Sequence, residues 1–280
     1  MQDNQLPDDI DQTVERALAE DVGTGDISAD ILHEGSISTA HVICRETAVL
    51  CGTAWFDSTL RHLDERVEIS WHAADGDAVR DKMQLCTVKG PSRAILTGER
   101  TALNFLQTIS ATATHARRYA ERVKGLPVRI LDTRKTLPGL RSAQKYAVRC
   151  GGCSNHRMGL YDAILLKENH ILACGSIIEA IDRARQLHPD VPVEIEVEDL
   201  NETAAALTAG ANRLLLDNFN LESLRKAVML NNGRATLEAS GGITLETIRS
   251  IAETGIDYIS IGSITKDIKA VDMSMRFQYE

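Results

Sequence analysis

In the second half of the chain, short apolar runs alternate with amphipathic segments. The apolar runs have the length of buried strands and occupy residues 128–132, 163–167, 193–197, 213–217, 235–240 and 257–262. The segments between them place apolar residues at helical spacing, at residues 140–149, 176–188, 201–210, 221–230 and 245–255. This alternation predicts parallel strands joined by helices that pack over the sheet.

The spacing of the runs favours an α/β barrel over a dinucleotide-binding sheet. The last four strands begin 20, 22 and 22 residues apart, which leaves room for one helix and minimal loops. No GxGxxG motif follows the first strand. Six strands are clear and a seventh can be accommodated, so the pattern alone does not establish an eight-stranded barrel.

The first half of the chain has a different pattern. Residues 8–20 place apolar side chains at helical spacing, and residues 36–90 contain short β-like runs separated by Gly, Asp and Pro. Residues 97–123 lack proline and predict a helix, which we interpret as a connector. The sequence therefore predicts an N-terminal α/β domain with the connector helix at 1–112 and an α/β barrel domain at 113–280.

Polar and charged residues follow or line six successive strands of the predicted barrel. In chain order they are Thr133, Arg134, Lys135, Lys167, Glu194, Glu196, Glu198, Asp217, Ser240, Gly241, Gly242, Gly262 and Ser263. The carboxyl ends of barrel strands carry catalysis, because the loops there vary while the strands stay packed. A single polar residue at a strand end would more often be a helix cap, but polar residues at the ends of six successive strands predict an active site.

The glycines after the last two strands predict a phosphate site. Glycine lets backbone N–H groups approach an anion closely, and the start of the next helix adds a favourable dipole. Along the third strand, Glu194, Glu196 and Glu198 share one face and are expected to point into the barrel. Three carboxylates on one face of a strand repel one another and need a cation, which we expect to be Lys167, a bound Mg²⁺ or both. For one of the three glutamates we expect a structural Glu–Lys pair.

The net charge of −9 argues against a nucleic acid or a membrane as partner of the general surface. Within residues 129–167, however, there are eight Lys or Arg and two acids, so this segment carries +6 and the remainder −15. The segment is either a solvated helix face or a pocket for a small polyanion. The acidic N-terminus, without a signal peptide, and six dispersed cysteines predict a cytoplasmic protein with reduced thiols.

Cys150 and Cys153, with His156 nearby, have a spacing that also occurs in zinc sites. A second pair of ligands is missing, although Cys174 offers one more sulfur. We therefore expect this segment to be a structural glycine turn rather than a zinc site.

Nearly the whole chain resembles the quinolinate phosphoribosyltransferase family. The similarity rests on the segments EDVGTGDIS, GERTALNFLQTISATAT, DTRKTLPGLRSAQKYAV, GGCSNHRMGLYDAILLKENH, EIEVEDL, LLLDNF, EASGGI and DYISIGSIT. The resemblance implies an N-terminal α/β sandwich joined to an open, seven-stranded α/β barrel. It also implies a homodimer whose active sites combine both subunits.

The resemblance further implies the reaction of quinolinate with phosphoribosyl pyrophosphate to give nicotinate mononucleotide, pyrophosphate and CO₂ with Mg²⁺, in NAD biosynthesis. The positions that match the family's dicarboxylate-binding residues are Arg134, His156, Arg157 and Lys167, with Arg100 from the partner subunit. Lys135 matches the position near phosphoribosyl pyrophosphate, and Glu196 and Asp217 match those that face the ribose and its metal ion. By this similarity, Lys135, Lys167, Glu196 and Asp217 are the expected catalytic residues.

Cys153 departs from the family, which usually has Gly or Ala in this loop, and adds volume beside His156 and Arg157. Three alternatives stay open on the sequence. One is a Schiff-base aldolase that uses Lys167. The others are a paralogous phosphoribosyltransferase with a different acceptor and a non-catalytic barrel that senses anions.

Overall fold

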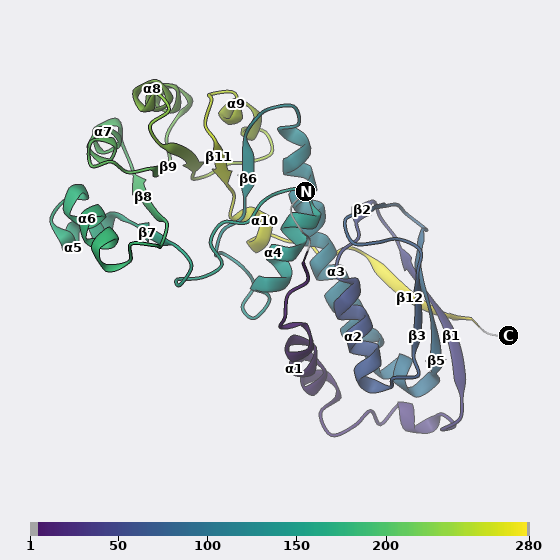
Figure 1. Ribbon diagram of the computed structural model, residues 1–280. Helices are drawn as coiled ribbons and strands as arrows, with labels where there is room; N and C mark the ends of the chain where they lie inside the picture. The colour runs from purple at the N-terminus through teal and green to yellow at the C-terminus, as the bar shows by residue number, and fades with distance from the viewer. Residues whose placement is uncertain (1–4, 279–280) are drawn as a thin grey trace. The chain divides into compact units, whose positions relative to one another are not determined.

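The computed structural model describes residues 5–278, and the chain divides into two compact units (Figure 1). Unit 1 contains the chain up to Arg117, residues 136–152 and the segment from Ile264 onward. Unit 2 contains residues 118–135 and 153–263. The helices of residues 5–278 lack the combination of length and apolar character that a bilayer crossing needs.

Unit 2 is built on a parallel sheet in the order β6-β11-β10-β9-β8-β7. Its strands are β6 (Arg129–Leu131), β7 (Ile164–Leu166), β8 (Val193–Val197), β9 (Arg213–Asp217), β10 (Thr236–Ser240) and β11 (Tyr258–Ser260). All six lie within the apolar runs that predicted them. The predicted α/β alternation is therefore confirmed strand by strand.

The segment around Ser154 adds one isolated parallel bridge to this sheet, with Leu131 of β6. The Ser154 N–H donates to the Ile130 carbonyl at 2.8 Å, and the Asp132 N–H donates to the Ser154 carbonyl at 3.2 Å. These bonds use the edge of β6 that does not face β11, since β11 receives its bonds from the alternate residues. The described residues therefore form six parallel strands and one isolated bridge, whereas the resemblance implied seven strands.

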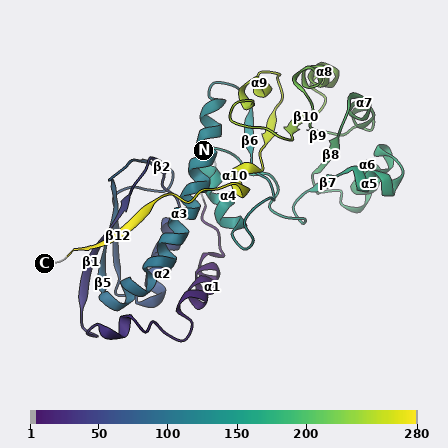
Figure 2. The same ribbon diagram turned by 180° about the vertical axis from the view of Figure 1, so that it is seen from behind.

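Helices cover the outer face of this arc of strands (Figures 1 and 2). They are α5 (Glu168–Cys174), α6 (Ile177–Leu187), α7 (Leu200–Thr208), α8 (Leu221–Asn231) and α9 (Ile248–Ala252). Side-chain oxygens of Ser176, Asp199 and Asn220 accept backbone N–H groups of the first turns of α6, α7 and α8. These caps fix where each helix begins: α7 and α8 start directly after the loops that follow β8 and β9, and α6 starts directly after α5.

Unit 1 contains an antiparallel sheet in the order β12-β1-β5-β3. Its strands are β1 (Ile37–Cys44), β3 (Glu68–Trp71), β5 (Gln84–Pro91) and β12 (Met273–Gln278), beside a small pair of β2 (Ala48–Val49) and β4 (Ala78–Val79). Both views show α2 (Thr53–Leu63) and the first part of α3 (Ser92–Arg122) on one face of this sheet. Their apolar residues, such as Phe56, Leu60 and Leu103, form one core with the sheet residues. The remaining elements are α1 (Ile10–Val22), η1 (Ala29–Ile31), α4 (Arg141–Cys150) and α10 (Ser263–Lys266).

The division of the chain is less simple than the predicted domains 1–112 and 113–280. Residue 112 lies inside α3, and the segment from Ile264 belongs to unit 1. The reason is the pairing of β12 with β1, in which Met273 lies opposite Cys44 and Gln278 opposite Thr39. The prediction assigned this strand to the barrel, because nothing in its local pattern shows that its partner is near the start of the chain.

Candidate active site

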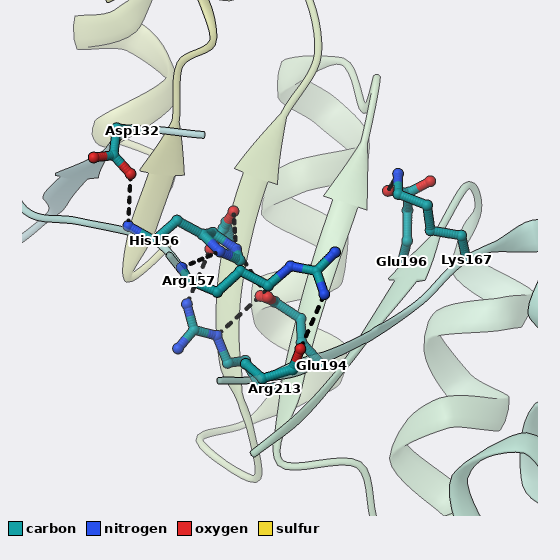
Figure 3. A network of polar contacts seen from close by, with 9 residues as sticks. Asp132, His156, Arg157, Lys167, Glu194, Glu196 and Arg213 are labelled. Carbon is teal, nitrogen blue, oxygen red and sulfur yellow. Dashed lines mark hydrogen bonds and ion pairs between the residues drawn. The ribbon is translucent and has the colours of Figure 1, made fainter. Parts of the chain in front are cut away.

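Three charged residues stand at the carboxyl ends of neighbouring strands in unit 2. The Lys167 ammonium donates a hydrogen bond to the Glu196 carboxylate (Figure 3). Asp217 ends β9, the next strand. Burial and the negative charge of Glu196 raise the pKa of Asp217, while the charges of Lys167 and Lys135 act against this rise. The four predicted catalytic residues are therefore close enough to act on one another electrostatically.

The carboxylates of β8 do not behave alike. Glu196 lies beside Lys167 with its side chain 14% exposed, and Glu194 is buried deeper in the barrel with its side chain 5% exposed. Glu198 was predicted to share their face, but β8 ends at Val197 and Glu198 is exposed. The prediction was wrong for Glu198 because the alternation of faces stops where the strand stops.

Two arginines form the cationic side of the site. Burial lowers the pKa of Arg157, and the positive charge of Arg134 lowers it further. The Arg157 guanidinium donates to the Ala163 carbonyl at 2.9 Å, which fixes the side chain against the loop before β7. Two guanidinium groups that influence each other in this way make a site suited to an anion.

The loop that carries His156 and Arg157 is held by Asp132, directly after β6. Asp132 is fully buried. One of its carboxylate oxygens accepts the His156 N–H at 2.9 Å, and the other accepts the Asn155 side-chain amide at 2.6 Å. Cys153 is also buried, and the loop keeps its bridge to β6 although this residue is larger than Gly or Ala.

Below this loop lies a buried polar cluster that the sequence reasoning did not identify. The Nε2 atom of His156 lies 3.0 Å from Glu194 and 3.5 Å from Glu238, and Arg213 contacts the same two carboxylates at 2.9 and 3.2 Å. Burial raises the pKa of Glu238 to about 7, and the charge of Glu194 adds to the effect. For Glu194, burial is outweighed by His156 and Arg213, so its pKa is lowered.

One signal in the sequence pointed to this cluster. Arg213 and Glu238 are charged residues inside otherwise apolar strands, at the first residue of β9 and the third of β10. A charge in such a position is buried only when it has a partner. The strand pattern therefore indicated two buried charges that need partners, but it did not show which residues those partners are.

The glycine turns after β10 and β11 differ in their backbone conformation. Gly241 and Gly242 have φ values of +100° and +58°. A Cβ atom on Gly241 would overlap the Asn218 side chain, whose amide donates to the Asp217 carboxylate at 2.8 Å. After β11, a Cβ atom on Gly262 would lie 3.0 Å from the side chain of Lys135.

Hydroxyl groups accompany both turns. Ser240 ends β10 opposite Asp217 of β9, and its carbonyl accepts the Asn218 N–H at 2.9 Å. The Ser263 hydroxyl is hydrogen-bonded to the Tyr119 hydroxyl at 3.1 Å. At the end of β6, the Thr133 hydroxyl accepts the Lys135 N–H at 3.1 Å.

Arg100 belongs to the other compact unit. It is exposed on α3 and lines a pocket of about 310 Å³ together with Gly25, Asp26 and Thr97. The structure thus leaves Arg100 available at the surface of unit 1, and the role that the resemblance gives it stays a prediction.

In residues 5–278, one group of side chains has atoms spaced closely enough to hold a metal ion, namely His156, Glu194 and Glu238. Cys150 and Cys153 are not part of it, and all six cysteines are free thiols. The prediction of Mg²⁺ beside Glu196 and Asp217 concerns different side chains.

The chain matches the models of both halves of one enzyme family. Residues 26–110 match the quinolinate phosphoribosyl transferase N-terminal domain, and residues 112–276 match the C-terminal domain. The probable nicotinate-nucleotide pyrophosphorylase (carboxylating) of Bacillus subtilis is 40% identical over 257 residues, which cover 91% of this chain and 89% of that protein. The nicotinate-nucleotide pyrophosphorylase (carboxylating) of Mycobacterium leprae is 38% identical over 273 residues, covering 94% and 95%.

The fold is likewise similar to solved structures. The nicotinate-nucleotide pyrophosphorylase from Francisella tularensis superposes with a TM-score of 0.95 and 44% sequence identity, covering 98% of both chains. This agreement extends over both compact units.

Proposed function

Because this chain belongs to the quinolinate phosphoribosyl transferase family, we propose that its barrel rim joins quinolinate to phosphoribosyl pyrophosphate. The products are nicotinate mononucleotide, pyrophosphate and CO₂, and the reaction serves NAD biosynthesis in the cytoplasm. The observation that carries the proposal is the charge arrangement around Asp217, where two carboxylates and two lysines act on one another. Both substrates are polyanions, and the reaction passes through a positively charged sugar, so a site with both signs of charge suits it.

Quinolinate binds to the cationic side of the rim. Arg134, Arg157 and Lys167 provide the positive charges for its two carboxylates, and His156 stands beside them. Charge-assisted hydrogen bonds of this kind contribute about 1.5–3 kcal/mol each. Within the cation-rich segment 129–167, Arg134, Arg157 and Lys167 therefore serve a small dianion, whereas Arg141, Lys145 and Arg149 lie on α4 in unit 1.

The sugar substrate binds beside Lys135, Glu196 and Asp217. Its 5-phosphate lies against the glycine turns at Gly241, Gly242 and Gly262, with the hydroxyls of Ser240 and Ser263 beside them, because backbone N–H groups at such turns bind phosphate oxygens. Thr133 lines the same edge next to Lys135.

A magnesium ion fits the donor set on this edge. Burial and the charge of Glu196 raise the pKa of Asp217. The two carboxylates repel each other, and a bound cation would relieve this repulsion. Carboxylate oxygens are preferred magnesium ligands. When bound with pyrophosphate, Mg²⁺ supplies positive charge that stabilises the leaving group.

The chemistry begins as the bond from the sugar C1 to pyrophosphate breaks, with its electron pair staying on the pyrophosphate oxygen. Glu196 and Asp217 stabilise the positive charge that develops on the sugar ring. The lone pair of the quinolinate nitrogen then forms the new bond to C1. The C2–carboxylate bond breaks next, with its electron pair staying on C2, where the positive charge of the adjacent ring nitrogen stabilises it. CO₂ leaves, and the electron pair on C2 takes a proton from water.

Arg100 completes the site from a second copy of the chain. In this arrangement the enzyme is a homodimer, and each rim receives one guanidinium from the α3 helix of its partner. The support is that Arg100 is exposed on α3, outside the barrel that carries the other predicted ligands.

The test is an assay with quinolinate that is radiolabelled at the 2-carboxylate. We expect CO₂ release that requires both phosphoribosyl pyrophosphate and Mg²⁺, with one pyrophosphate formed per CO₂. Nicotinate, which lacks the 2-carboxylate, serves as the control acceptor. Turnover of another acceptor with none of quinolinate would identify a paralogous transferase, and covalent trapping of a carbonyl substrate on Lys167 by borohydride would identify an aldolase.

A further inference from the structure

The buried cluster below the rim joins four strands or loops through one histidine. Figure 3 shows His156 from the loop after the Ser154 bridge, Glu194 from β8 and Arg213 from β9. Glu238 comes from β10. Glu238 is fully buried and Glu194 is 4% exposed. Buried charges at such positions are costly unless each has a fixed partner, so the geometry of the cluster is strongly constrained.

Both ring nitrogens of His156 are occupied by the protein itself. The Nδ1 atom accepts the backbone N–H of Arg157 at 2.7 Å and therefore carries no proton. The Nε2 atom lies 3.0 Å from a Glu194 oxygen and 3.5 Å from a Glu238 oxygen, so it carries the proton and donates it. These contacts assign His156 as the neutral tautomer with hydrogen on Nε2.

Arg213 fixes the two carboxylates that face the ring. Its Nε atom donates to Glu194 at 2.9 Å, and its Nη2 atom donates to Glu238 at 3.2 Å. The guanidinium also lies over the Tyr258 ring, 5.3 Å from its centre. A cation among these carboxylates would stand close to the guanidinium charge, so the cluster suits a hydrogen-bonded histidine better than a metal ion.

We infer that Glu194 and Glu238 are positioning residues that hold His156 in its neutral Nε2–H form and, through the His156 ring, fix the backbone of Arg157. The inference rests on the proposed function, in which Arg157 binds a quinolinate carboxylate. Of the five groups predicted to bind the dicarboxylate, the four Lys and Arg side chains contribute positive charge. His156 contributes the orientation of its neighbour.

The consequence for the reaction is selective. A change in the cluster moves Arg157 and therefore affects quinolinate. Lys135 and Asp217, which serve the sugar substrate, are held by other residues, including Thr133 and Asn218. Loss of the cluster should weaken the binding of quinolinate and leave the binding of phosphoribosyl pyrophosphate unchanged.

The first measurement uses the intact wild-type enzyme and does not depend on a variant that folds. Long-range nitrogen–proton NMR spectra of the labelled enzyme distinguish the two histidine tautomers, and the His156 signal is assigned by its absence in His156→Gln. We expect a protonated Nε2 and an unprotonated Nδ1. A protonated Nδ1, whether in the other tautomer or in the imidazolium, would overturn the inference.

The second measurement compares Glu194→Leu with Glu194→Gln, whose side-chain oxygen still accepts from Nε2–H. We expect Glu194→Leu to raise KM for quinolinate about tenfold, the loss of one oriented charge-assisted contact, and to change KM for phosphoribosyl pyrophosphate less than about twofold. In Glu194→Gln, KM for quinolinate should stay close to the wild-type value. The matched control is Glu222→Leu on α8, which removes an exposed glutamate paired with Lys226 and should leave both KM values unchanged.

An equal loss for both substrates, or no rescue by glutamine, would show a general structural role and refute the inference. A wild-type enzyme that does not turn over quinolinate would instead refute the proposed function. In that case the NMR measurement would still decide whether the cluster fixes the tautomer of His156.

Discussion

Asn218 and Gly241 approach so closely that the glycine cannot carry a side chain. A Cβ atom on Gly241 would overlap the Asn218 amide, and Asn218 in turn donates to Asp217 at 2.8 Å. The turn after β10 is therefore coupled to the carboxylate at the end of β9. This contact connects the predicted phosphate turn with a predicted catalytic residue.

Gly241→Ala should consequently lower kcat and destabilise the enzyme together. Alanine would displace Asn218 and would also adopt a φ of +100°, which costs on the order of 1–3 kcal/mol. The control is Gly233→Ala, because Gly233 has a φ of +74° but open space around its Cβ position. If both variants lose the same kcat and the same free energy of unfolding, the contact with Asn218 has no catalytic importance.

Removal of the Lys167 charge should weaken quinolinate binding. In Lys167→Met, a contact to a substrate carboxylate is lost and Glu196 loses its hydrogen-bonded partner, so we expect KM for quinolinate to rise about 10- to 100-fold. The comparison is Lys226→Met, which breaks an exposed pair with Glu222 on α8. Unchanged KM in Lys167→Met would remove Lys167 from the binding site.

Glu196→Gln and Asp217→Asn should lower kcat more than they raise KM for quinolinate. Both carboxylates act on charge that develops in the transition state, and loss of one such group typically costs roughly a hundredfold or more in kcat. Steady-state kinetics with each substrate varied in turn provide the measurement. A normal kcat with weakened binding alone would contradict the assigned role.

The stability of the enzyme should fall as the pH rises from about 4.5 to about 7, through Glu238. Its pKa is raised from an ordinary value of 4.5 to about 7, so in this window the folded state binds more protons than the unfolded state. Each pH unit in the window costs at most about 1.4 kcal/mol from this group. The lowered pKa of Glu194 acts in the opposite direction, but only below its ordinary value of 4.5.

Urea unfolding at several pH values measures this dependence. Glu238→Gln removes the titrating group, so its free energy of unfolding should depend less on pH between about 5 and 8 than that of the wild type. Identical slopes for the two proteins would show that Glu238 has the same pKa in the folded and the unfolded state.

Mixed dimers should test the role of Arg100. Arg100→Ala and Lys167→Ala chains are unfolded and refolded together, so that subunits exchange. In a mixed dimer, one site has an intact barrel and an intact Arg100 from its partner, while the other site carries both lesions. About half of the dimers are mixed, so activity should recover to about a quarter of the wild type. If mass spectrometry shows that mixed dimers have formed and their activity is no higher than that of the two parent homodimers, Arg100 acts in the site of its own chain.

The strands and helices of the barrel could be predicted because each has a local cause. Runs such as 213–217 are apolar and of strand length, and the segments between them have helical spacing and polar caps. The residues at the strand ends followed from topology, since parallel strands present their carboxyl ends at one edge. Lys167, Glu196 and Asp217 were therefore found together without knowledge of any distance.

The parts that escaped prediction depend on partners far away in the chain. Arg213 and Glu238 were not singled out from the sequence, because their pairing with Glu194 is set by the register of three strands. Asp132 appeared to be one acid in a basic segment, whereas it holds the loop of His156. Local sequence patterns do not encode which buried charges meet.

The pairing of β12 with β1 has a consequence for how the chain is made. The edge of β1 that receives β12 has no strand to cover it until residues 273–278 leave the ribosome, after every strand of the barrel has already been synthesised. An exposed strand edge invites pairing with other chains. The N-terminal sheet can therefore complete its strand pairing only after β12 has been synthesised, although β1 is made first. A chain without residues 273–278 would leave this edge of β1 exposed to pairing with other chains.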